Sequence, residues 1–114
     1  VHENVKQAII NASELDTRLV MRSLRNTERV LNNPAVERLL EKEAALGADL
    51  KFEDIVEEVA GVYPKIMKTG DMDAGAWSCG MVAGLIHDKP TVKKLIDDIM
   101  AEADAIINQR LTGL

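Results

Sequence analysis

The four consecutive residues Trp77, Ser78, Cys79 and Gly80 bring together groups that can form a binding site. They provide an apolar wall, a hydroxyl group and a glycine that leaves backbone N–H groups accessible. At the start of a helix, such N–H groups attract anionic or electron-rich ligands. The sequence therefore predicts a ligand-binding site at Trp77, Ser78 and Gly80. Packing of this segment against another helix is the alternative.

Metal and nucleophile chemistry find little support in the sequence. A zinc site needs several nitrogen or sulfur ligands at paired spacings, and His2, His87 and Cys79 have no such spacing. In a helix, Cys79 and His87 would lie about two turns apart, too far for a thiol and its general base. We therefore expect no metal site, and we assign no catalytic residue to this chain. Cys79 is expected to be a small buried side chain.

The charged residues form two kinds of group. Neighbouring carboxylates are typical of solvated helix faces, and we interpret Glu57 with Glu58 and Asp97 with Asp98 in this way. Asp71 and Asp73 are better interpreted as helix-entry residues, because an anionic group near a helix start is favourable. Three arginines, Arg22, Arg25 and Arg29, also lie close together in the sequence. These arginines could bind a small anion or pair with neighbouring acids, and we favour ion pairing.

Length and composition limit the class of protein. With 114 residues the chain is one domain or a piece of one, and it is much shorter than a (β/α)8 barrel, which has about 250 residues. Hydrophobic residues make up 46% and aromatic residues 3%, so a core must be built from aliphatic side chains. The net charge of −5, without a concentrated basic block, argues against nucleic-acid binding. No apolar stretch approaches the roughly 20 residues of a membrane span, and a single cysteine indicates a reducing compartment. We therefore expect a cytoplasmic protein with no membrane contact.

Hydrophobic periodicity predicts four helices, at residues 4–12, 34–46, 52–68 and 91–111. Asn33 and Pro34 form a typical helix start, and Gly47 forms a typical helix end. Within the third helix, Gly61 and Pro64 interrupt the pattern and predict a kink or a split near its middle.

Three further segments follow different patterns, within a fold class that we expect to be mainly α. Residues 18–22 form a short apolar run that suits one short strand or a continued helix, and residues 26–32 resume a helical pattern. Residues 70–88 are rich in small side chains, and in a helix four of them would share one side: Ala76, Gly80, Ala83 and Gly84. Since glycine costs about 1 kcal/mol inside a helix, this side predicts the close approach of another backbone or of a flat ligand.

Several motifs, in chain order, resemble the carboxy-terminal part of nitronate monooxygenases, formerly called 2-nitropropane dioxygenases. They are VHENVKQA at 1–8, DT at 16–17, RSLRNT at 22–27, GDMDAGAWSCG at 70–80, and GLIHD at 84–88 with PT at 90–91. Each motif alone is weak, but their combination is specific. The resemblance extends over the whole chain without a large gap.

The resemblance implies a place in an FMN-binding TIM-barrel enzyme that oxidises alkyl nitronates with dioxygen. On this basis residues 1–64 are a helical substrate-side domain. Residues 65–114 then return to complete the barrel, with residues 91–111 as an outer barrel helix. The resemblance also places Trp77, Ser78 and Gly80 near the flavin, and these are the cofactor-binding residues that we expect.

The chain lacks the parts that come first in this family. These are the amino-terminal barrel strands, the flavin phosphate loop and the catalytic histidine, whose role neither His2 nor His87 matches. We therefore expect a C-terminal fragment of an FMN-dependent oxidoreductase that is inactive alone and holds no FMN alone. Its main partner would be the missing N-terminal barrel portion. One alternative is a free-standing helical interaction module without catalysis, which forms a homo-oligomer through exposed apolar faces. A third hypothesis is an acyl reductase that shares the flavin barrel.

Overall fold

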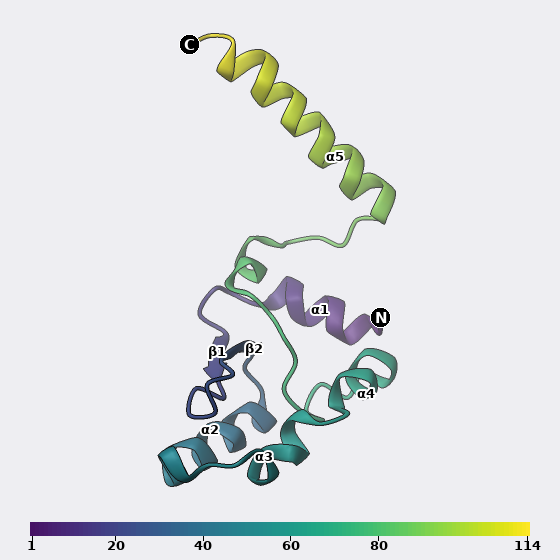
Figure 1. The fold of residues 1–114 in the computed structure, drawn as a ribbon. Helices are drawn as coiled ribbons and strands as arrows, with labels where there is room; N and C mark the ends of the chain where they lie inside the picture. The colour runs from purple at the N-terminus through teal and green to yellow at the C-terminus, as the bar shows by residue number, and fades with distance from the viewer.

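The computed structural model describes residues 1–114, and most of its elements are helices. In chain order the elements are α1 (Glu3–Asn11), β1 (Thr17–Val20), β2 (Glu28–Leu31), α2 (Pro34–Leu46), η1 (Gly47–Asp49), α3 (Phe52–Val59), α4 (Val62–Thr69), η2 (Met81–Leu85), α5 (Val92–Ala105) and η3 (Ile106–Leu111). The segments η1 and η2 are 3-10 helices, and η3 continues α5 as a π-helix. Helices α1 to α4 and the small sheet form one body, and α5 projects away from it (Figure 1). The molecule is therefore elongated, with extents of 57 × 34 × 19 Å. The prediction of a mainly α fold is confirmed.

The helices with clear local signals form where the sequence predicts them. The Asn33 side chain accepts a hydrogen bond from the backbone N–H of Val36 at 2.8 Å, and α2 then runs to Gly47. The helical segment 52–68 is split, because Gly61 adopts a left-handed backbone with φ of 69° between α3 and α4. The expected interruption is thus confirmed.

The sheet confirms one expectation and corrects another. Residues 17–20 form β1, so the strand alternative for residues 18–22 is the correct one. The helix expected at residues 26–32 is wrong, because residues 28–31 form β2 and pair antiparallel with β1, with Thr17 opposite Leu31. In this register Val20 and Val30 lie on the same face of the sheet, and both are fully buried. Burial and pairing of so short a segment outweigh its intrinsic preference.

Residues 70–88 do not form the helix that we considered for their small side chains, and the only helical part of the segment is the short 3-10 helix η2. The backbone of this segment bonds to other elements rather than to itself. The N–H of Ala76 donates to the carbonyl of Glu58 at 2.7 Å, and the N–H of Cys79 donates to the carbonyl of Arg29 at 3.1 Å. Because a backbone N–H has one hydrogen to donate, an N–H that bonds to a distant carbonyl is not available for a helical bond.

Two hydrophobic clusters meet at β2. The first consists of Val20, Met21, Val30, Val36, Leu39, Leu50 and Ile55. The second consists of Val5, Leu31, Val62, Ile66 and Trp77. Because successive side chains of a strand point to opposite faces, Val30 and Leu31 extend into different clusters. The strand β2 therefore connects both halves of the core.

Helix α5 has no buried residue, although it is amphipathic. Its apolar stripe includes Leu95, Ile96, Ile99 and Met100, each exposed by about half. Exposed apolar surface therefore lies on α5, whereas Trp77 and Ala83 are each 2% exposed. No helix combines the length and the apolar composition needed to cross a bilayer.

Candidate functional site

The segment Trp77–Cys79 lies beside β2 and pairs with it. The N–H of Leu31 donates to the carbonyl of Trp77 at 3.3 Å, and Ser78 forms an isolated antiparallel bridge with Val30. Together with the bond from Cys79 to Arg29, these contacts fix the segment at the edge of the sheet. Trp77 and Ser78 of the predicted site therefore lie on extended backbone attached to the core, and Gly80 stands at the start of the short 3-10 helix η2.

The three predicted site residues face different surroundings. The indole of Trp77 lies in the second core cluster and is 2% exposed, so in this chain it anchors the segment. Ser78 is exposed, and its hydroxyl donates to the carboxylate of Glu28. Gly80 is exposed as well. Of the three, Ser78 and Gly80 present groups to the outside.

The glycines of this region differ in how closely other atoms of the chain approach them. A Cβ on Gly75 would lie 2.5 Å from the Cβ of Val62 and 2.6 Å from the carbonyl oxygen of Glu58. A Cβ on Gly84 would lie 2.7 Å from the backbone nitrogen of Glu14. The nearest atom to a Cβ on Gly80 would be Val82 Cγ1, at 3.9 Å. Close packing within the chain explains Gly75 and Gly84, whereas nothing inside the chain requires a glycine at position 80.

This contrast gives a matched pair of variants. Gly75→Ala is expected to lower the free energy of unfolding by about 1–3 kcal/mol, because the backbone around it must shift. Gly80→Ala is expected to change it by no more than about 0.5 kcal/mol. Urea denaturation of both variants measures the difference. Equal losses would show that position 80 is as tightly packed as position 75.

Cys79 is suited to a structural role. Its side chain is partly buried, and burial raises the pKa of the Cys79 thiol above its ordinary value of 9.0. The thiol therefore stays protonated and is a poor nucleophile at neutral pH. No group of three or more metal-ligating side chains occurs anywhere in the structure.

The carboxylate pairs have structural roles too. Glu58 is 3% exposed and accepts two hydrogen bonds from Lys42 at 3.0 Å, so it joins α3 to α2. Asp97 and Asp98 pair with Lys93 and Lys94 along α5. Glu58 thus departs from the expected solvated face, because it is buried in an ion pair.

A cavity of about 240 Å³ lies where the end of α1 meets the sheet. It is lined by Ala8, Asn11, Ala12, Asp16, Leu31 and Asn32. The Oδ1 atom of Asn32 is buried without a hydrogen-bond partner. No sequence pattern predicted this cavity, because its lining residues come from separate segments.

The hydrogen bonds of Asp16 predict that the stability of the folded chain depends on pH. Hydrogen bonds from the N–H and hydroxyl of Ser13 hold the pKa of the Asp16 carboxyl below its ordinary value of 3.8. A lowered folded-state pKa adds stability above pH 3.8, and that stability is lost as the pH falls through the folded pKa. Asp16→Asn should therefore lower the melting temperature slightly at pH 7, and the difference from the parent chain should shrink as the pH falls below 3.8. A difference that is unchanged from neutral to acid pH would contradict this assignment.

The fold is mainly helical with one two-stranded sheet, and the candidate site lies against strand β2 of that sheet. The family model for nitronate monooxygenase matches residues 1–102, so the chain belongs to the nitronate monooxygenase family. The chain is also similar to FabK from Thermotoga maritima, with a TM-score of 0.83 and 27% identity over all of this chain and 35% of that chain. A methionine-to-alanine variant of the same protein matches with a TM-score of 0.76 and 25% identity, over all of this chain and 32% of that chain. The chain thus spans about a third of the length of these solved proteins.

Proposed function

We propose that this chain is the C-terminal part of an FMN-dependent oxidoreductase that oxidises alkyl nitronates with dioxygen. The family match over residues 1–102 carries the proposal. The match to only 35% of FabK supports the view that the active enzyme contains further elements. In this proposal residues 1–64 form the substrate-side domain, and residues 65–114 return to the barrel with α5 on its outside.

The exposed edge at Ser78 and Gly80 fits the flavin that the family implies. Gly80 leaves room for close approach from outside the chain, and the Ser78 hydroxyl is exposed beside it. Trp77 holds this edge from the core side. When bound, FMN supplies electron transfer between nitronate and dioxygen. This chain's residues would line the cofactor, while the phosphate loop and the catalytic histidine come from the missing portion, so the isolated chain would hold no FMN.

The exposed stripe of α5 supports a docking role for this helix. An amphipathic helix gains most of its stability by packing its apolar face, and α5 buries no residue within this chain. The missing barrel portion is the occupant that we propose for this face. The lone thiol of Cys79 supports a reducing, cytoplasmic location.

A charge on the α5 stripe tests this role. Ile99→Glu should change the free energy of unfolding of this chain by no more than about 0.5 kcal/mol, because Ile99 is 52% exposed. Ala101→Glu, on the opposite side of α5, is the matched control. Thermal denaturation should give equal melting temperatures for the two variants. A loss of more than about 1 kcal/mol in Ile99→Glu alone would show that α5 packs on this chain.

An activity assay tests the proposed reaction. The polypeptide encoded by the reading frame that includes this chain and the sequence upstream of Val1 is purified with FMN. We expect it to consume oxygen when an alkyl nitronate is added. Reduction of an acyl substrate without nitronate-dependent oxygen uptake would instead support the acyl reductase.

The same stripe also favours the second candidate, a helical module that associates with itself. This candidate predicts a defined oligomer of the 114-residue chain. Light scattering combined with gel filtration measures it. A chain that stays monomeric would exclude the module and leave the oxidoreductase fragment.

A further inference from the structure

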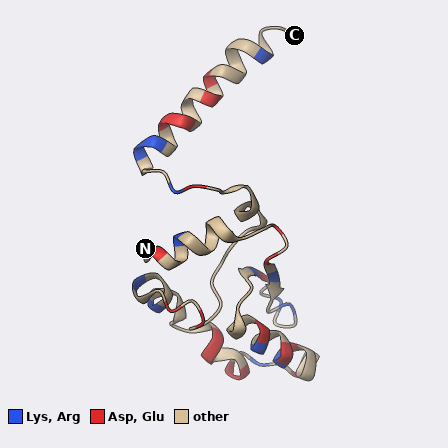
Figure 2. Cartoon of the chain, turned by 180° about the vertical axis from the view of Figure 1, so that it is seen from behind, with Lys and Arg blue, Asp and Glu red and all other residues tan.

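A positive patch lies on the hairpin formed by β1 and β2. Four of the six arginines of the chain occur in it, at Arg18, Arg22, Arg25 and Arg29. Figure 2 shows basic residues along this hairpin and acidic residues over much of α2 and α3. Because the whole chain has a net charge of −5, this clustering is local.

The turn between the strands brings two of these arginines together. The N–H of Arg25 donates to the carbonyl of Arg22 at 3.0 Å. The two residues therefore occupy the first and fourth positions of a β-turn, in which the Cα atoms lie within about 7 Å. Side chains as long as arginine can reach one oxyanion from these positions.

No acidic side chain lies within ion-pair distance of this pair, so the ion pairing that we favoured from the sequence is wrong. Neither Arg22 nor Arg25 takes part in any of the ion pairs of the structure. The carboxylate of Glu43 bonds to the turn in another way: it accepts from the N–H of Met21 at 3.0 Å and from the hydroxyl of Ser23 at 3.3 Å. Glu43 thus fixes the turn and leaves both guanidinium groups free.

The backbone of this turn is strained at two residues. Met21 and Arg25 have φ of 58° and 55°, and they are the two non-glycine residues of the chain with positive φ. The buried side chain of Met21 explains why a methionine is kept there. Arg25 is exposed, and no contact within the chain explains why an arginine stands where glycine would be unstrained. Strain at an exposed charged residue is typical of a binding site.

We propose that the turn Arg22–Arg25 binds a phosphate or diphosphate group of a small organic molecule. Two guanidinium groups can each bind phosphate oxygens in a bidentate manner, which favours this anion. A nucleic acid is a poor fit, because the basic residues are confined to one hairpin of an acidic chain.

The position of the turn suits a ligand of nucleotide size. Strand β2 leads from the turn to Val30, which pairs with Ser78. Val30 is five residues from Arg25, which is at most about 17 Å of extended chain, so a molecule bound by its phosphate at Arg25 can extend toward Ser78 and Gly80. The anion site itself depends on the turn alone and not on the proposed flavin chemistry.

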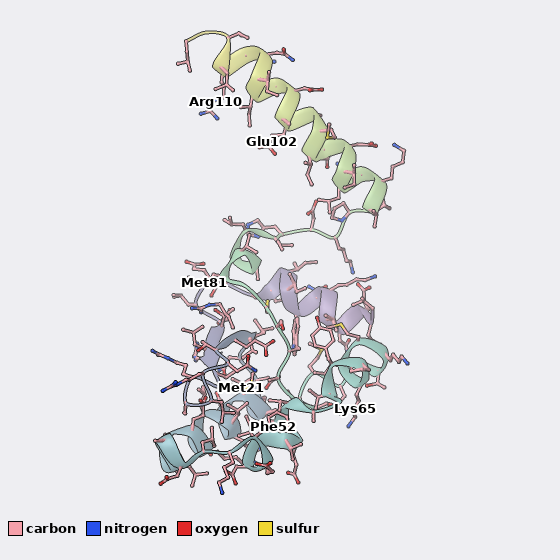
Figure 3. All side chains as sticks on the ribbon, viewed as in Figure 1. Met21, Phe52, Lys65, Met81, Glu102 and Arg110 are labelled. Carbon is pink, nitrogen blue, oxygen red and sulfur yellow. The ribbon has the colours of Figure 1, made fainter.

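Titration of the 114-residue chain with sodium pyrophosphate, followed by amide NMR spectra, tests the proposal. We expect saturable shifts at residues 21–26. Arg22→Ala and Arg25→Gly should each weaken binding by about tenfold, the cost of one charge-assisted contact. Arg25→Gly also removes the strained φ, so it should fold at least as well as the parent chain. Arg110→Ala in η3, far from the hairpin (Figure 3), removes the same charge and should leave binding unchanged.

The remaining outcomes separate the sources of the anion. Tighter binding of ADP than of pyrophosphate supports a nucleotide ligand, and equal binding supports recognition of the phosphate group alone. Shifts that sodium chloride reproduces at matched ionic strength would overturn the proposal. Equal weakening by Arg110→Ala, or equally tight binding of duplex DNA, would also overturn it. None of these results depends on flavin. The anion site can therefore be confirmed when the proposed function fails, and the proposed function can be confirmed when the anion site fails.

Discussion

Replacing Trp77 by alanine is expected to lower the free energy of unfolding by about 3–5 kcal/mol. The indole is 2% exposed and packs with Val5, Leu31, Val62 and Ile66, so its removal leaves a cavity that joins three elements. A small domain has about 5–15 kcal/mol of stability in total, so this variant loses a large share of it. Urea denaturation followed by circular dichroism is the measurement.

Two further variants keep this test informative. Tyr63→Ala removes an aromatic side chain that is 47% exposed, and it should lower the free energy of unfolding by less than about 1 kcal/mol. Trp77→Phe preserves most of the apolar volume, and it should remain folded even where Trp77→Ala does not. A loss below about 1 kcal/mol in Trp77→Ala would mean that the indole is free to contact a ligand directly.

Replacing Asn33 by alanine is expected to cost about 3 kcal/mol, since one side chain makes three hydrogen bonds. Its oxygen caps α2, and its amide nitrogen donates to the carbonyls of Met72 and Gly75, both at 2.9 Å. These two bonds hold the chain just before Trp77. Removal of the Asn33 side chain therefore destabilises α2 and also the segment that carries Ser78 and Gly80.

Two comparisons separate the cap from the other bonds. Asn33→Ser keeps a capping oxygen and loses both amide N–H donors. The stability of this variant should therefore lie between that of the parent chain and that of Asn33→Ala. Thr91→Ala removes only the cap of α5 and should cost at most about 1 kcal/mol. Calorimetric melting of the three variants gives the order. Equal losses for Asn33→Ala and Thr91→Ala would contradict the role of the two donors.

The sequence predicts the elements whose signals are local. Asn33 with Pro34 starts α2, Gly47 ends it, and Gly61 separates α3 from α4. Each of these signals acts through residues next to it in the chain. The apolar face of α5 is equally local, and the structure confirms that it is helical.

Other elements depend on distant partners and could not be predicted in this way. Strand β2 forms because it pairs with β1 on one side and with Trp77–Cys79 on the other. The burial of Trp77 depends on α1 and α4, at the start and in the middle of the chain. Ion pairing of Arg22 and Arg25 was favoured for the same reason, because the sequence does not show that Glu43 bonds to the N–H of Met21 and the hydroxyl of Ser23 instead.

The FMN content of two purified polypeptides tests the central claim most directly. One is the 114-residue chain, and the other is the longer product that its reading frame encodes with the sequence upstream of Val1. We predict flavin absorbance in stoichiometric amount for the longer polypeptide and none for the chain alone. A yellow 114-residue chain, or a longer polypeptide that cannot take up FMN, would contradict the account.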